Sequence, residues 1–270
     1  MSDVIFAPDI YRAYNLDLRN LSDAEAAQHF AANSGERRVY GQTSSSQAFL
    51  SMRWLRGNGL EVGAGGHPTP LFGDARAQLN DCDEELAFGG KHLDYRISID
   101  SPEFREIGKT FDFTIACHVL EHADSFLRAI ENLVAVTRKR GIVYLVLPDI
   151  YWLLDRTWLP YFDFEHHVTE YHEPLHFVKQ HDALYIKGWG NATHAINEHA
   201  ELSAEYKAAL QTGYIPQNMR FMHHKHNYQF QDWIDMLLRA RTFLGNTFRL
   251  MDARFGHERL DCHFILEVSG

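Results

Sequence analysis

The segment LEVGAGG, residues 60–66, has the composition of a cofactor-binding turn. An apolar stretch with one acidic residue runs directly into four small residues. Glycines allow left-handed turns and close backbone approach to a ligand, and open α/β sheets bind cofactors at the carboxyl ends of their strands. The run has neither the Lys-Ser/Thr of a P-loop nor GxGxxG spacing, so a simple tight turn is the alternative interpretation. The candidate cofactor residues are Glu61, interpreted as acting through water or by ordering the loop, and Gly63, Ala64, Gly65 and Gly66.

A second concentration of side chains that could do chemistry lies between residues 150 and 226. It contains ten of the 17 histidines and three tryptophans. A neutral imidazole can accept the proton of a hydroxyl group, and it can also bind a metal ion. The histidines spaced most suitably for a metal are His166, His167, His172, His176 and His181. No HExxH pattern is present and Pro174 interrupts a shared helix face, so we predict base catalysis and no functional metal.

Periodic patterns place these residues on a doubly wound sheet. Residues 111–119 form a short apolar strand, and Asp124 or Ser125 can cap a helix whose apolar residues recur at helical spacing. Residues 137–141 are expected to close that helix with cations and a glycine. The near-continuous apolar run 142–147 is typical of a buried parallel strand.

Shorter patterns predict the remaining elements. Ser22 as cap, with Glu25 three residues later, forms a capping box at the start of a helix. A second helix is expected over residues 47–56. The other expected elements are strands at 75–79 and 95–99, a helix at 231–243, and an antiparallel hairpin of 247–255 with 261–268.

The pair EVGAGG (61–66) and FDFTIACHVLEH…RKRGIVYLVLPD (111–149) resembles the class I S-adenosylmethionine-dependent methyltransferases. This resemblance implies S-adenosylmethionine as cofactor. It also implies an α/β fold, a doubly wound and mostly parallel seven-stranded sheet with a C-terminal antiparallel hairpin and a long insertion after strand five. The chain would divide into a helical flank or lid (1–58), the cofactor-binding core (59–149), an acceptor-binding insertion (150–226) and the last helix with the hairpin (227–270).

The resemblance also implies cofactor contacts at other strand ends. A carboxylate after the second strand would accept hydrogen bonds from the ribose hydroxyls; Asp81 is the first choice and Asp83 the alternative. Glu121 and His122, in the turn after the fourth strand, are interpreted as architectural. The other predicted contacts are Asp100 and Ser101 at the adenine, and Cys117 and His118 beside the methyl group.

Beyond residue 147 the chain resembles a methyltransferase subgroup associated with cell-surface glycan biosynthesis. The matching segments are LPDIYWLLD (147–155), FEHHVTEYHE (164–173), with Glu170-Tyr171 as an acidic-aromatic pair, and HKH (224–226). Alternation along an extended segment would put both histidines of HKH on one face. The resemblance implies catalytic roles for Asp149 and Asp155, as residues that orient acceptor hydroxyls or a histidine, and for the base candidates His166, His224 and His226.

We therefore predict methyl transfer from S-adenosylmethionine to a sugar hydroxyl of a glycan or nucleotide-linked sugar. The alternative enzyme is a small-molecule natural-product O- or N-methyltransferase. The alternative of another class is a non-catalytic S-adenosylmethionine-binding protein.

Composition restricts partners and compartment. The net charge of −10 disfavours a nucleic-acid partner. Three cysteines without CxxC spacing are consistent with a reducing compartment. The N-terminal residues lack the basic start and apolar run of a signal peptide, and no window reaches the roughly 18 apolar residues of a membrane span. We expect a cytoplasmic protein without a membrane span.

Overall fold

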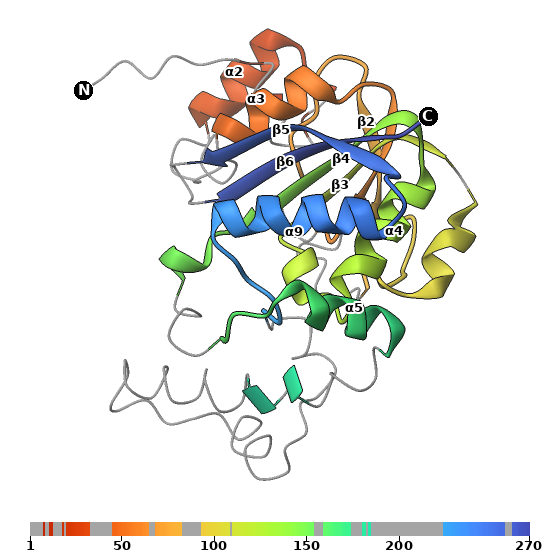
Figure 1. Cartoon of the computed structure of the whole chain (residues 1–270). Helices are drawn as coiled ribbons and strands as arrows, with labels where there is room; N and C mark the ends of the chain where they lie inside the picture. The colour runs from red at the N-terminus through yellow and green to blue at the C-terminus, as the bar shows by residue number, and fades with distance from the viewer. Residues whose placement is uncertain are drawn as a thin grey trace, which may run out of the picture.

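The structure of the chain is a computed structural model (Figure 1). It describes residues 8, 11–12, 18, 20–32, 45–64, 68–82, 93–108, 110–153, 159–173, 180–181, 183–184, 224–256 and 261–270. Several residues considered above lie outside these ranges, namely Gly65, Gly66, Asp83, Asp155 and His176.

The described residues form one six-stranded sheet in the order β2-β1-β3-β4-β6-β5. The strands are β1 (Asn58–Val62), β2 (Arg76–Asn80), β3 (Phe111–Cys117), β4 (Thr137–Pro148), β5 (Phe248–Gly256) and β6 (Asp261–Val268). Strands β1 to β4 pair in parallel, whereas β6 is antiparallel to both β4 and β5. The predicted α/β class and the C-terminal antiparallel hairpin are confirmed.

The predicted third strand is not a strand in the structure, so the expectation of seven strands is wrong. Tyr95 makes a single bridge to Asn80 at the end of β2. Beyond this bridge the Asn80 side chain replaces backbone pairing: its amide donates to Ile97 O at 2.9 Å and accepts from Ile97 N at 3.2 Å. The Asp94 carboxylate accepts from Leu79 N at 2.9 Å in the same way. Three backbone hydrogen bonds of Asp94 and Tyr95 to the end of β2 are thus continued by side chains, where a longer backbone ladder was expected.

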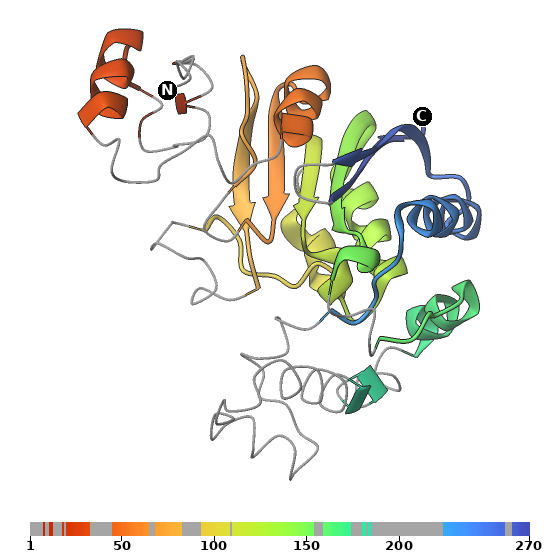
Figure 2. The ribbon, with the colours of Figure 1, turned by 90° about the vertical axis from the view of Figure 1, so that its left-hand side faces the viewer.

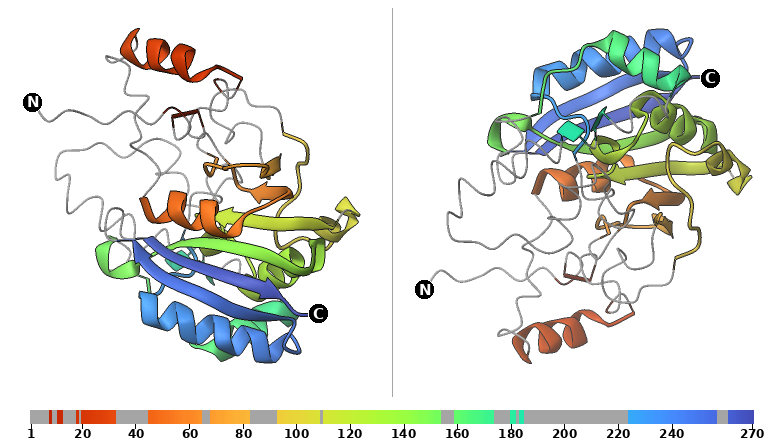
Figure 3. Two further views of the ribbon diagram at one scale, coloured as in Figure 1. Left: turned by 90° about the horizontal axis from the view of Figure 1, so that it is seen from above. Right: turned by 90° about the horizontal axis from the view of Figure 1, so that it is seen from below.

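Helices cover both faces of the sheet (Figure 3). Helix α3 (Ser45–Trp54) lies on one face, and α4 (Phe126–Val136) and α9 (Phe230–Phe243) lie on the other. Helix α5 (Phe164–His172) packs against α4 and lies beyond the carboxyl ends of the parallel strands (Figure 2). No described helix is both long and apolar enough to cross a membrane.

Short 3-10 segments follow the strands at the carboxyl edge. They are η2 (Pro102–Ile107), η3 (Leu120–His122) after β3 and η4 (Ile150–Trp152) after β4. Helix α2 (Asp23–Ala32) lies beyond the β2 edge of the sheet and begins with the predicted capping box. Ser22 N donates to the Glu25 carboxylate at 2.7 Å and Glu25 N donates to Ser22 Oγ at 3.3 Å, which confirms that prediction.

The core consists of two layers separated by the sheet. Successive side chains of a strand point to opposite faces, and β4 shows this clearly. Val143, Leu145 and Leu147 pack toward α4 and α9, whereas Tyr144 and Val146 pack toward α3. Burial on both faces explains why the run is apolar without alternation.

Helix α4 begins at the predicted cap but ends earlier than predicted. Ser125 is the N-cap, and its hydroxyl accepts a hydrogen bond from the third helical residue. The helix ends at Val136, so the expectation that the next five residues close it is wrong. Thr137 already begins β4 and pairs with β3, and Arg138 Nε donates to Asp112 Oδ1 at 2.6 Å. Pairing with β3 replaces the last helical turn.

Candidate functional site

The glycine turn lies at the carboxyl end of β1, as predicted. Gly63 has a φ of 63°, in the left-handed region, and Ala64 after it is buried. A Cβ on Gly63 would lie 2.2 Å from Val119 Cγ2, so the turn and the residue before η3 leave room only for glycine. The buried Glu61 carboxylate accepts a hydrogen bond from Thr69 N at 2.7 Å across the turn. This hydrogen bond is consistent with a loop-ordering role, and the role of Glu61 toward a cofactor stays a prediction.

The two predicted acidic contacts beyond the turn differ in their surroundings. Asp81 directly follows β2 and is buried, with Oδ1 accepting from the next backbone N–H at 2.8 Å. Asp100 Oδ2 accepts from the N–H groups of Asp124 and Ser125, at 2.6 and 3.1 Å. It thereby stabilises the start of α4, while Ser101 begins η2. The predicted contacts of Asp81 with ribose and of Asp100 with adenine stay predictions.

His118 lies between two carboxylates just after β3. Its Nδ1 is 3.3 Å from Glu121 Oε1 and its Nε2 is 3.3 Å from Asp261 Oδ1. Burial opposes a charged ring, but these carboxylates outweigh burial and raise the pKa of His118 to about 10. Burial also opposes the Glu121 charge, yet His118 and His122 lower the pKa of Glu121 to about 2. The ring is therefore held as an imidazolium, at a backbone φ of 54° that is uncommon for a residue other than glycine.

We expect the His118 ring to titrate with a midpoint well above the ordinary 6.5 and no higher than about 10. The side chain is 42% exposed, so water weakens its ion pairs and makes about 10 an upper bound. Because the folded-state pKa is raised, these pairs stabilise the fold fully below pH 6.5, and their contribution declines as the pH rises toward 10. An NMR pH series of the histidine ring signals, assigned with His118→Asn, measures the midpoint. A value at or below 6.5 would contradict the ion pairs.

Cys117, the last residue of β3, is a neutral thiol. It accepts a long hydrogen bond from Gln47 of α3 at 3.6 Å. Burial, followed by the negative charges of Glu61, Asp261 and Glu121, raises the pKa of Cys117 well above its ordinary value. A thiol that stays protonated is a poor nucleophile, and the predicted place of Cys117 beside the methyl group stays a prediction.

Asp149 joins two segments at the carboxyl edge. Its Oδ1 accepts from Tyr151 N of η4 at 2.8 Å, and its Oδ2 accepts from Phe230 N at the first turn of α9 at 3.0 Å. Among the described residues, its only side-chain partner is the Cys262 thiol at 3.9 Å, so it orients no histidine there. Asp149 therefore fixes η4 and α9 relative to β4.

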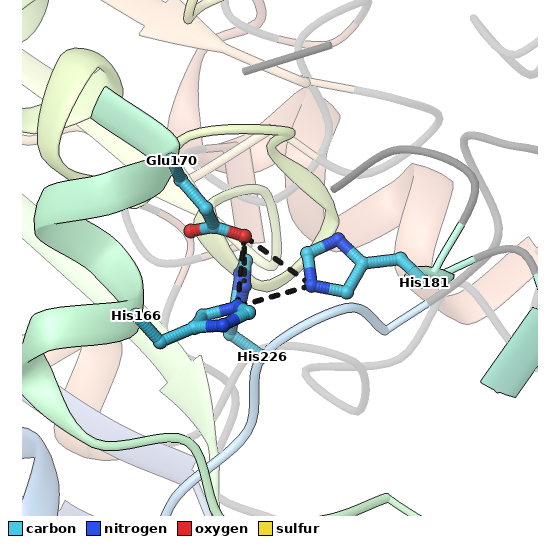
Figure 4. A group of neighbouring side chains, drawn as sticks. All are labelled: His166, Glu170, His181 and His226. Atoms are coloured by element: carbon cyan, nitrogen blue, oxygen red, sulfur yellow. Dashed lines mark hydrogen bonds and ion pairs between the residues drawn. The ribbon is translucent and has the colours of Figure 1, made fainter. Parts of the chain in front are cut away.

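Three histidines converge on one carboxylate beyond the sheet edge (Figure 4). Glu170 of α5 is fully buried, and its Oε1 lies close to three imidazole Nε2 atoms, at 3.0 Å from His166, 3.2 Å from His181 and 2.9 Å from His226. The Nε2 atoms of His166 and His181 are themselves 3.2 Å apart. His166 lies one turn before Glu170 on α5, whereas His181 and His226 come from two other segments. These four residues are called the histidine–glutamate cluster below.

The second carboxylate oxygen of Glu170 is also held. His167 Nδ1 lies 3.1 Å from Oε2, and His167 Nε2 lies 2.5 Å from the Tyr228 hydroxyl. Burial opposes ionisation, but His226 and the other imidazoles keep the pKa of Glu170 far below its ordinary value. Burial lowers the pKa of His167 to about 4, and burial together with His226 lowers the pKa of His181 to about 2. The carboxylate is thus ionised, and His167 and His181 are neutral.

His224 and His226 belong to different clusters, contrary to the expectation that they share a face and a site. The half-buried His224 ring lies 4.8 Å from that of His122 in η3, centroid to centroid, and its neighbours include Glu121. His226 instead turns to Glu170. This segment forms one isolated bridge, between Tyr228 and Asp149 just after β4, and Lys225 N donates to Glu121 O, so strand alternation does not set the directions of its side chains.

Sequence reasoning missed the centre of the histidine–glutamate cluster. Glu170 was expected only as half of an acidic-aromatic pair, although its i+4 spacing from His166 on a helix was a usable signal. His181 was considered only for the metal interpretation that we ranked second. The histidine spacing connects His181 with α5, but no sequence signal connects His226 with it, because His226 is distant along the chain. His172, also considered as a ligand, is exposed at the end of α5 and outside the cluster.

Comparisons with known proteins show likeness at low identity. No protein-family model matches the chain, and no curated protein matches it. Among solved structures, a chain from the complex of the Haloferax volcanii Trm112 methyltransferase activator with a methyltransferase is 9% identical, with 99% of this chain and 100% of that chain covered and a TM-score of 0.45. A SAM-dependent methyltransferase from Thermotoga maritima is 12% identical, with 90% of this chain and 98% of that chain covered and a TM-score of 0.42. The N-methyltransferase NodS from Bradyrhizobium japonicum is 12% identical, with 83% of this chain and 94% of that chain covered and a TM-score of 0.37. These similar structures are methyltransferases, but such low likeness supports no argument about the acceptor.

Proposed function

We propose that this protein is an S-adenosylmethionine-dependent methyltransferase that acts on a sugar hydroxyl. The observation that carries the proposal is the left-handed turn at Gly63, at the carboxyl end of β1 and among the parallel strands. Open α/β sheets bind their cofactors at this place. The turn also lies within the motif that resembles the methyltransferases.

The charge at this edge fits the cofactor. Apart from burial, the charges of Glu61, Asp261 and Glu121 raise the pKa of the Cys117 thiol. These three carboxylates outnumber the one imidazolium, His118, so the net charge at the end of β3 is negative. S-adenosylmethionine carries a positive sulfonium, which such a potential attracts. When bound, the cofactor supplies an electrophilic methyl group.

The residues that would hold the cofactor lie at the ends of β1 and β2. The Gly63 turn would let the backbone approach the amino-acid moiety. Asp81 would accept hydrogen bonds from the ribose hydroxyls, since a carboxylate can accept two from a vicinal diol. The main contribution of these residues to the reaction would be alignment of the methyl group with the acceptor oxygen.

A sugar acceptor is supported by the subgroup resemblance and by aromatic rings at the same edge. Tyr151 in η4 and Tyr161 are 52% and 62% exposed, which leaves their faces available for stacking on a sugar. His224 is our candidate for the base that accepts the hydroxyl proton. It lies against η3, whose preceding residue, Val119, lies next to the Gly63 turn.

We expect S-adenosylmethionine and S-adenosylhomocysteine to bind the wild-type protein with micromolar-range affinity in calorimetry. Asp81→Ala should weaken both by about 1–3 kcal/mol, because charge-assisted hydrogen bonds to the ribose are lost. Asp74→Ala is the matched control, since it removes an exposed carboxylate before β2 instead of after it.

The absence of heat with either ligand on folded wild-type protein would overturn the proposed function. If Asp81→Ala and Asp74→Ala weaken cofactor binding equally, the contact of Asp81 with the ribose is contradicted, but the proposed function is not. Transfer of a radiolabelled methyl group to a panel of nucleotide sugars and oligosaccharides tests the acceptor class. Transfer to amines and not to sugars would reject the sugar hydroxyl.

A further inference from the structure

We propose that the histidine–glutamate cluster, His166, Glu170, His181 and His226, is a binding site for a divalent transition-metal ion, with Zn²⁺ as the ion that fits best. The sequence led us to expect no metal, and only the fold brings these donors together. The proposal does not depend on the cofactor or on the acceptor.

Four of the six distances between the donor atoms match tetrahedral coordination. Zinc lies about 2.0–2.2 Å from imidazole nitrogen and carboxylate oxygen, so neighbouring donors in a tetrahedron are about 3.3 Å apart. Glu170 Oε1 lies 2.9, 3.0 and 3.2 Å from the three imidazole nitrogens. The Nε2 atoms of His166 and His181 are 3.2 Å apart, and all four donors lie within 4.8 Å of one another. A slight outward movement of the side chains would accommodate the ion.

Protons alone satisfy this arrangement poorly. Each imidazole Nε2 carries either one proton or one lone pair. Yet the Nε2 atoms of His166 and His181 each face both Glu170 Oε1 and one another. One proton on a ring cannot point in both directions, and two facing lone pairs repel. If all three rings carry their proton on Nε2 and donate to Oε1, three donors share an oxygen that has only two lone-pair sites. An ion at the centre removes the conflict, because all four atoms then direct lone pairs at it.

Burial makes a counter-charge necessary. The side chains of Glu170 and His226 are fully buried, and those of His181 and His166 are 3% and 12% exposed. In the described part of the chain, every ion-pair partner of Glu170 is a histidine. A carboxylate at such depth is stable as an anion only beside a partner of opposite charge. A divalent ion supplies it without protonating an imidazole.

The residues around the cluster are arranged as around the ligands of known protein metal sites. Outer hydrogen bonds orient metal ligands, and here His167 holds the second oxygen of Glu170 while Tyr228 holds His167. The Phe162 ring stacks on His166, with centroids 4.0 Å apart, and meets the other two imidazoles edge-on. This ring forms an apolar wall on one side of the donors.

The donor set selects the ion and its role. Three imidazoles with one carboxylate suit zinc, whereas Mg²⁺ and Ca²⁺ prefer oxygen ligands. Four protein donors close a tetrahedral shell, as in structural zinc sites. The ion would join α5, His181 and the segment before α9 beyond the sheet edge. His166 and His226 would then be ligands instead of bases, which leaves His224 as the base candidate.

Elemental analysis of the full chain, purified without a polyhistidine tag or chelator, tests the site. We expect about one zinc ion per wild-type chain, as one closed four-ligand site binds. Glu170→Gln and His181→Ala should each weaken Zn²⁺ binding by at least about tenfold in competition with a chromophoric chelator. Glu165→Gln and His172→Ala are matched controls on α5 with exposed side chains, and they should bind zinc like the wild type.

Two results would overturn the site. One is a wild-type chain that contains no zinc and takes up none after chelation and readdition. The other is Zn²⁺ binding by Glu170→Gln and His181→Ala that is as strong as that of the wild type. If His122→Ala then loses the ion, the zinc belongs to the group of Glu121, His122 and His224 instead.

The wild-type protein also provides a test that needs no variant to fold. In long-range nitrogen–proton NMR spectra of the metal-free chain, one equivalent of Zn²⁺ should shift the Nε2 signals of three histidines and leave that of His172 in place. Unchanged histidine nitrogens would contradict the proposal even if all variants were insoluble.

Discussion

Gly63→Ala should abolish detectable binding of S-adenosylmethionine. The backbone at Gly63 has a φ of 63°, and the added Cβ would lie 2.2 Å from Val119 Cγ2. The turn must therefore move away from η3 or change conformation, and either change removes the surface that the cofactor would approach. Calorimetry with the cofactor, alongside circular dichroism to verify folding, measures the effect.

Gly73→Ala is the control that separates backbone strain from loss of the site. Gly73 has nearly the same φ, 62°, but a Cβ there meets no atom within 4 Å. Left-handed strain should cost both variants about 1–2 kcal/mol of unfolding free energy. Only Gly63→Ala should lose cofactor binding. If folded Gly63→Ala binds the cofactor like the wild type, the turn is only architectural and the proposed function loses its main support.

His224→Ala should lower kcat for methyl transfer by about 10²–10⁴ and leave the affinity for S-adenosylmethionine nearly unchanged. The reason is that a base acts on the acceptor hydroxyl and does not hold the cofactor. Rates with radiolabelled cofactor and the best acceptor from the sugar panel, together with calorimetry, separate the two quantities.

His172→Ala provides the matched control, because it removes an exposed imidazole from α5 outside both clusters. Wild-type turnover by His224→Ala would show that another residue is the base, or that the enzyme catalyses transfer by positioning the reactants alone. If only His226→Ala loses turnover, and added zinc does not restore it, His226 is the base and our choice of His224 is contradicted.

Elements encoded by neighbouring residues were predictable from the sequence. The left-handed turn needs only the glycine after β1, and the start of α4 needs only Ser125 before an apolar helical repeat. The hairpin of β5 and β6 follows from two apolar runs separated by a short polar segment. In each case the deciding interactions lie within a few residues, so the local pattern determines the conformation.

The sequence alone thus determined the α/β class, the glycine turn after β1 and the cap of α4, whereas tertiary structure decided how distant side chains meet. The Asn80 side chain replaced the pairing of the expected third strand, and no propensity of the segment from Tyr95 onward reveals that competition. Glu170 gathered histidines from three segments, while His224 and His226, only two residues apart, joined different clusters. Spacing sets which side chains share a face of one element, but contacts between elements depend on how the whole chain packs, which no short pattern contains.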